Sequence, residues 1–226
     1  MPRLIGTLVR WSLVPFLLLL AAAMAGGLSR ALYGGLGTAD WAWLAGGFAF
    51  RMAARLAWAR LGRDDPFEFI DTLEHELTHA LAGYATFCPP VSLSASLKSG
   101  GEVELKGTNP LAALAPYCLP LWCLLAALLG LAVKAGLHSA WNHGLLFLLG
   151  CFAWRLFREF RWRQTDLHLY GFVFSSVMVA VLLMLSIGLL LWLGGYLGWE
   201  WLPLAAREAY QGLGAWYELL FKNIHR

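Results

Sequence analysis

The chain has 226 residues, of which 59% are hydrophobic and only 14% are charged, and its formal net charge is +3. Soluble domains carry about 25% charged residues, so this composition excludes an ordinary soluble domain and indicates a membrane protein. A net charge this small, without lysine and arginine runs interleaved with aromatic residues, excludes nucleic acid as a partner. We expect a single domain over residues 1–226 that crosses the lipid bilayer of a bacterial inner membrane several times.

The N-terminal part of the chain predicts helices between residues 11 and 60. A charge-free run from 11 to 29 follows Arg3 and Arg10. Its length suits an uncleaved membrane anchor, and the two arginines place the N-terminus in the cytoplasm. A second helix is expected over 38–58, tilted or partly interfacial because its arginines must reach water.

A third helix has a clear start signal. Asp65 suits the N-cap, and Pro66 suits the first helical position, because proline lacks the N–H that this position leaves unpaired. The helix is expected to run to about Phe87, before Pro89 and Pro90 stop it. It carries the motif on which the functional hypothesis depends.

That motif is His75-Glu76-Leu77-Thr78-His79, which has the His-Glu-x-x-His pattern of zinc sites. Histidines four residues apart lie on one helix face and can reach one ion. Catalytic zinc takes three protein ligands and leaves a fourth position for water. We therefore expect His75 and His79 to bind Zn²⁺, and Glu76 to act as the base that takes a proton from the zinc-bound water.

A third zinc ligand is expected from a distant segment. We favour Asp166, because an aspartate at the start of a charge-free helix is costly in lipid unless it has a partner. His168 and Glu159 are the alternatives, although His168 would not share a helix face with Asp166. In a purely structural interpretation, Asp166 caps the following helix and pairs with Arg161 or Arg163.

Residues 91–106 are the strand-like part of the chain. Apolar and polar residues alternate over 91–98 and again over 102–106, with Ser-Gly-Gly at 99–101 as the turn. This pattern predicts a β-hairpin. An isolated hairpin is marginal in water, so we expect it to lean on the helices or on a partner strand. It is either a simple connector or an edge that pairs with a substrate strand.

Three apolar segments and a mixed tail follow the hairpin. A span is expected over 109–133, irregular at its proline-rich start, then an apolar helix over 135–157 and a charge-free run over 169–199. Residues 201–226 mix aromatic and charged residues and suit an interfacial helix. The fold class is thus an all-α polytopic membrane protein with about five or six transmembrane or re-entrant helices and one small hairpin near 91–106.

The predicted ligands constrain the topology, because they must meet at one depth. Basic residues favour the cytoplasm for both 51–63 and 155–163. Three crossings between these segments would place Asp166 on the opposite side of the membrane. We therefore expect either 135–157 or the hairpin to depart from simple crossing.

These parts together resemble the site-2 protease family of intramembrane zinc metallopeptidases, in a minimal form with a core over 66–195. The resemblance implies that His75, His79 and Asp166 bind Zn²⁺ and that Glu76 is the catalytic base. It also implies a transmembrane protein substrate that docks as a β-strand and is cut within or near its membrane segment, as in regulated intramembrane proteolysis. The family's second motif is Asp-Gly, whereas here Leu167 follows the aspartate.

Two other functions are compatible with the same residues. A non-catalytic scaffold, or a subunit of a membrane assembly, would keep the metal without turnover and would bind a membrane-protein partner or a second copy of the chain. A metal transporter would use the ligands as a transit site. The four cysteines lack Cys-x-x-Cys spacing and have apolar neighbours, so we interpret them as small buried apolar residues.

Overall fold

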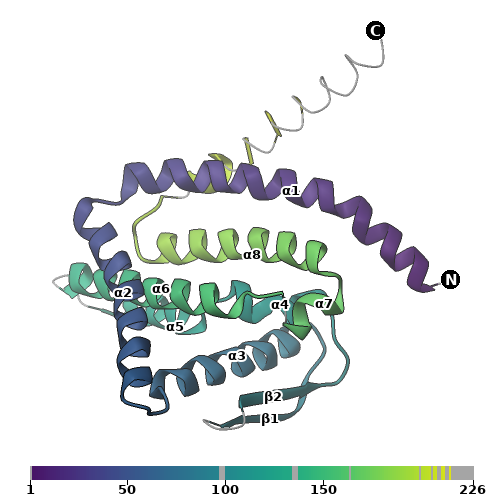
Figure 1. Cartoon of the computed structure of the whole chain (residues 1–226). Coiled ribbons are helices and arrows are strands. Elements are labelled where there is room, and N and C mark those ends of the chain that lie inside the picture. The colour runs from purple at the N-terminus through teal and green to yellow at the C-terminus, as the bar shows by residue number, and fades with distance from the viewer. Residues whose placement is uncertain are drawn as a thin grey trace. The chain divides into compact units, whose positions relative to one another are not determined.

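The structure is a computed structural model of the chain (Figure 1) that describes residues 2–96, 100–133, 137–162, 164–198, 200–204, 206–207, 210–211 and 214, with side chains from residue 9 onward. Two compact units emerge from the backbone contacts. One joins Met1–Leu36 with Val173–Arg226, and the other is Gly37–Phe172. All the residues predicted to bind metal belong to the second unit.

The first unit contains two long apolar helices, α1 (Pro2–Gly35) and α8 (Phe172–Leu193). Val9–Gly35 and Phe172–Leu193 are both long and apolar enough to cross a membrane. The structure thus has a helix for the anchor expected over 11–29 and another within the charge-free run at 169–199. Residues 201–204 of the predicted interfacial tail are helical, and residues 215–226 lie outside the described residues.

In the second unit, α2 (Thr38–Arg60) packs against α6 (His138–Glu159) along much of its length. Glycines permit this close approach. A Cβ added at Gly47 would overlap the carbonyl of Phe147, and one added at Gly150 would overlap the carbonyl of Leu44. Small residues at such crossings let the two backbones touch.

The motif helix is α3 (Pro66–Ala85). It begins as predicted, because the Asp65 carboxylate accepts a hydrogen bond from the Phe67 N–H at 3.0 Å and Pro66 takes the first helical position. It ends slightly before the expected Phe87, which itself adopts a left-handed φ of 61°. The helix thus ends through backbone reversal before the prolines are reached.

The predicted hairpin is present as β1 (Pro90–Ser96) and β2 (Gly100–Leu105). The strands are antiparallel, with Leu93 opposite Val103, and their register shifts between Pro90 and Ser92. Both strands pack against α3, as Figure 1 shows, so the hairpin leans on the helices as expected. Of the turn predicted at 99–101, Gly100 and Gly101 instead belong to β2. Residue 99 lies outside the described part of the chain, as do residues 97–98 of the first predicted strand.

The predicted span over 109–133 is broken into α4 (Pro110–Cys118) and α5 (Leu121–Gly130), which are bent by 71°. Proline sets both the start and the break. Asn109 caps α4 by accepting a hydrogen bond from the Ala112 N–H at 2.9 Å, with Pro110 as the first helical residue. Pro120 then precedes α5, where its missing N–H cannot continue the first helix.

Among the described residues, two helices are candidate membrane spans, or three if the bent α4–α5 pair counts as one. Helices α2, α3 and α6 match the predicted segments 38–58, 66–87 and 135–157 in position, but they are not among those candidates. The chain is therefore mainly helical with one small hairpin and with helices suited to a membrane. The expected total of five or six membrane helices stays a prediction.

Candidate metal centre

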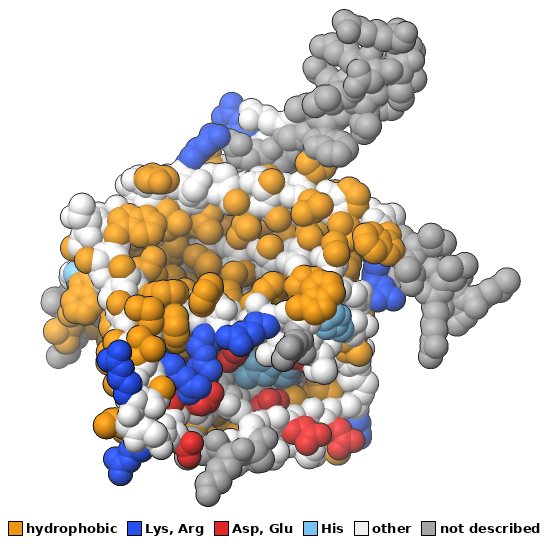
Figure 2. All heavy atoms as spheres, viewed as in Figure 1, with side chains coloured by type: hydrophobic (Ala, Val, Ile, Leu, Met, Phe, Trp, Pro, Cys, Tyr) orange, Lys and Arg blue, Asp and Glu red, His pale blue; other side chains and the backbone are white. Residues whose placement is uncertain are grey.

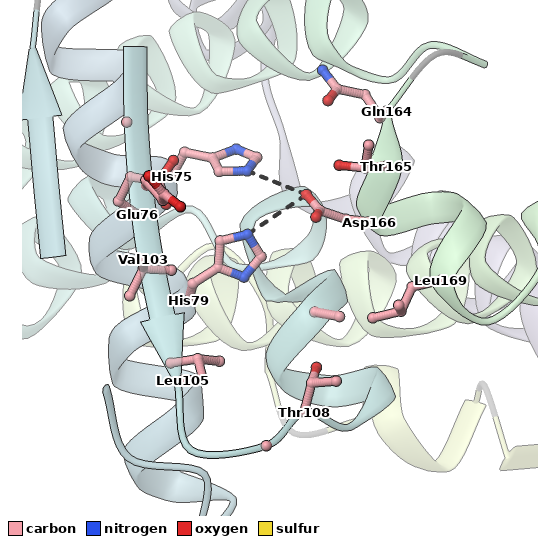
Figure 3. Close-up of a pocket in the computed structure, with 14 residues that line it drawn as sticks. His75, Glu76, His79, Val103, Leu105, Thr108, Gln164, Thr165, Asp166 and Leu169 are labelled. Atoms are coloured by element: carbon pink, nitrogen blue, oxygen red, sulfur yellow. Dashed lines mark ion pairs between the residues drawn. The ribbon is translucent and has the colours of Figure 1, made fainter. Parts of the chain in front are cut away.

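Three predicted ligands meet at one point although they come from distant segments. His75 and His79 lie on α3, and Asp166 lies on α7 (Thr165–Leu169). Each histidine Nε2 is 3.6 Å from the Asp166 Oδ2, and the donor atoms of all three residues lie within 4.8 Å of one another. Figure 3 shows both rings turned toward the carboxylate.

The short helix α7 separates the candidates for the third ligand. Gln164 is its N-cap, so Asp166 lies within the first turn and is not the cap. The His168 Nε2 instead lies against the Trp162 carbonyl, so His168 does not join the cluster. The structural interpretation paired Asp166 with Arg161 or Arg163, and Arg163 lies outside the described residues.

Each of the two imidazoles has its other ring nitrogen occupied. The His79 Nδ1 is 2.8 Å from the Ala112 carbonyl, which can only accept, so Nδ1 carries a proton. In the neutral ring, Nε2 then presents its lone pair to the cluster. The His75 Nδ1 is 3.4 Å from the Glu159 carboxylate. Glu159, considered above as a ligand, therefore contacts the ring nitrogen on the far side from the cluster.

The prolines of α4 explain why the Ala112 carbonyl is available. In a regular helix, the N–H of residue 116 would bond that carbonyl, but residue 116 is a proline and has no N–H. Pro120 likewise leaves the Pro116 carbonyl open, and the Arg155 side chain donates to it at 3.0 Å. The proline-rich start that the sequence marked as irregular thus supplies acceptors to the site.

Tyr117 is a contact that the sequence did not reveal. Its hydroxyl lies 3.1 Å from the Asp166 Oδ2 and donates to it, and its ring is edge-on to the ring of His75, with centroids 5.4 Å apart. The residue is fully buried. A tyrosine within an otherwise apolar segment needs a partner for its hydroxyl, and that was the one available signal.

The charge on Asp166 suits a metal ligand. Burial would raise the pKa of its carboxyl, but the neighbouring His75 and His79 outweigh this effect and hold that pKa well below the usual range. The carboxylate is therefore ionised at neutral pH. A carboxylate oxygen and imidazole nitrogens are donor types that bind zinc.

A buried ion-pair network supports the ligand-bearing helix. The Arg155 side chain, 2% exposed, pairs with Glu74 at 3.0 Å, and the other oxygen of Glu74 accepts a hydrogen bond from the Trp122 N–H at 3.2 Å. Arg51 of α2 pairs with Asp71 of α3. Figure 2 shows basic and acidic side chains gathered beside the pale-blue histidines. The network ties α3 to α2, α5 and α6.

A cleft of about 560 Å³ opens onto the cluster between β2 and α7. It is lined by both histidines, Glu76 and Asp166, and by small or apolar side chains that include Val103 and Leu169. Glu76 is 8% exposed and lies against β2, where a Cβ added at Gly101 would be 2.5 Å from its Cγ. The predicted base and the predicted ligands therefore share one opening.

Two of the three distances between the donor atoms suit a zinc ion. Ligands about 2.0–2.1 Å from a tetrahedral zinc lie roughly 3.4 Å from one another. Each histidine Nε2 is 3.6 Å from the aspartate oxygen, which is close to that value. The distance exceeds that of a good hydrogen bond and is within the range of an ion pair.

Comparison with known proteins places the chain in no family. No family model, no curated protein and no solved structure matches it. Its function is therefore inferred from the chemistry of the cleft and its donors.

Proposed function

We propose that this protein is a zinc-dependent metallopeptidase of the membrane that hydrolyses peptide bonds in membrane-protein substrates. The observation that carries the proposal is the convergence of His75 and His79 with Asp166, with the Nδ1 atom of each imidazole already occupied. The zinc ion itself would act as a Lewis acid and lower the pKa of water to about 7.

Glu76 would act as the general base. It follows His75 directly on α3 and lines the cleft, so its carboxylate lies next to the space where water and a peptide carbonyl would sit. It would accept a proton from the attacking water and deliver it to the leaving amine. Tyr117 would keep Asp166 oriented, and Glu159 would keep His75 oriented, while the peptide bond is hydrolysed.

Within the described residues, β2 pairs with a strand on one side only, and its other edge favours an extended polypeptide as substrate. β2 pairs with β1 on one side in a two-stranded sheet, and Gly101, Val103 and Leu105 of β2 line the cleft. A peptide strand placed in the cleft would pair with backbone groups on that edge. Peptide bonds in a helix are inaccessible to such pairing, so a transmembrane substrate would have to unwind locally.

The experiment compares Glu76→Gln with wild type for zinc content and for cleavage of a panel of synthetic transmembrane peptides, followed by mass spectrometry. We expect Glu76→Gln to retain one zinc per chain and to lose cleavage. Glu104→Gln, on the same strand but outside the cleft lining, is the matched control and should retain cleavage. Wild type that binds zinc without cutting any peptide would favour a metal-binding scaffold, and wild type without zinc would refute the proposal.

A further inference from the structure

We propose that Glu159 is a positioning residue that orients His75 for metal binding, an inference that depends on the zinc site proposed above. Glu159 is the last residue of α6, and its Oε2 lies 3.4 Å from the His75 Nδ1. The two nitrogens of an imidazole point away from each other. A carboxylate at Nδ1 therefore fixes the ring and its tautomer without competing for the ion at Nε2.

The location of Glu159 argues against a role in the stability of α6. The carbonyl end of a helix carries partial negative charge, so an acidic residue there is disfavoured and a basic one is preferred. Arg158, its neighbour, fills the basic role and pairs with Glu68 at 3.3 Å. A carboxylate at this disfavoured position is explained by the partner it reaches, and that partner is a ligand histidine.

Arg155 lies beside Glu159 and contributes a favourable charge. The two side chains are one helical turn apart, with the Arg155 Nε 4.0 Å from the Glu159 Oε2. Arg155 is itself fixed by Glu74 at 3.0 Å and by the Pro116 carbonyl at 3.0 Å. Its Nε has no hydrogen-bond partner within the described part of the protein, and the Glu159 carboxylate is the acidic group nearest to that nitrogen among the ion pairs of Arg155. His75 is thus connected through Glu159 and Arg155 to the buried ion pair with Glu74.

The two ligand histidines are supported differently. His79 donates to a neutral backbone carbonyl, whereas His75 faces a carboxylate. An anionic partner raises the basicity of an imidazole ligand more than a neutral one does, and loss of such a partner typically weakens metal binding about 10–100-fold. His75 is therefore expected to be the more strongly donating histidine, and Glu159 the cause of the difference.

The test measures zinc affinity by competition with a chromophoric chelator, on the full chain purified in detergent. Glu159→Ala should bind zinc about 10–100-fold more weakly than wild type. Glu159→Gln keeps the size of the side chain and an acceptor for the Nδ1–H, so it should recover part of that loss. Glu104→Gln, which removes a carboxylate on β2 outside the cleft lining, should leave the affinity unchanged.

A second readout separates orientation from folding. Cobalt(II) bound in place of zinc reports the geometry of its ligands by visible absorption, and Glu159→Gln should retain the wild-type band while Glu159→Ala shifts it. Equal zinc affinity in wild type and Glu159→Ala would overturn this inference and leave the zinc site standing. A cobalt band altered as strongly by Glu159→Gln as by Asp166→Asn would make Glu159 a ligand, which also overturns it. Wild type without zinc would refute the site itself.

Discussion

Gly101 provides the sharpest test of where the base lies. A Cβ at this position would be 2.5 Å from the Glu76 Cγ and 2.8 Å from both the Glu76 Oε1 and the Thr72 Cγ2. Carbon atoms in contact prefer about 3.5–4.0 Å, so Gly101→Ala must move either β2 or Glu76 by roughly 1 Å. Threonine is stiff at χ1 and cannot yield easily, which directs much of the displacement to the base.

A displacement of about 1 Å of a catalytic group costs on the order of 100-fold in rate, or ~2.7 kcal/mol in activation free energy. We therefore expect Gly101→Ala to lower kcat for transmembrane-peptide cleavage by about that factor. Zinc affinity should not change, because the three atoms nearest to a Cβ at this position belong to Glu76 and Thr72 and not to a ligand.

The assay is peptide cleavage in detergent followed by mass spectrometry, with zinc content measured on the same samples. Gly144→Ala is the matched control, because a Cβ there meets nothing within 4 Å, and it should cleave at the wild-type rate. Wild-type kcat in Gly101→Ala would refute the placement of Glu76 against β2. Loss of zinc together with activity would show that the strand supports the ligands rather than the base alone.

Three further predictions concern the ligands and their support. Asp166→Asn should weaken zinc binding more than about 100-fold, beyond the effect of losing an outer partner, whereas His168→Asn should leave chelator competition unchanged. Arg155→Met leaves the buried Glu74 carboxylate without its ion-pair partner and should cost about 3–5 kcal/mol of stability. Thermal unfolding in detergent measures this, and a melting temperature equal to that of wild type would refute a stabilising role for the Arg155–Glu74 pair. Pro116→Ala restores an N–H that competes for the carbonyl bonded by His79, so zinc affinity should fall by up to about 10-fold, and an unchanged affinity would show that this carbonyl does not orient the ring.

The local features of this fold were predictable because their causes are local. The Asp65 cap and Pro66 are adjacent in the sequence and act on the same turn of α3. The hairpin follows from alternation within a few residues, and the break in the 109–133 segment follows from its prolines. Asp166 was predictable for a different reason, because a carboxylate beside an apolar run requires a partner.

The support of the site was not predictable, because it depends on contacts between distant segments. Glu159 and His75 are 84 positions apart, and Tyr117 and Asp166 are 49 positions apart. No periodicity links such pairs, and only the folded chain brings them together. The number of membrane helices is equally hard to derive, since α2, α3 and α6 mix apolar residues with buried ion pairs that satisfy one another inside the protein.

The coordination of zinc in the purified protein tests the central claim most directly. X-ray absorption at the zinc edge reports the number and type of the bound atoms and their distances. The account predicts one zinc per chain, with two imidazole nitrogens and carboxylate or water oxygens at about 2.0–2.2 Å, and loss of one imidazole in His79→Ala. Sulfur at about 2.3 Å, or a protein that retains no zinc, would contradict it.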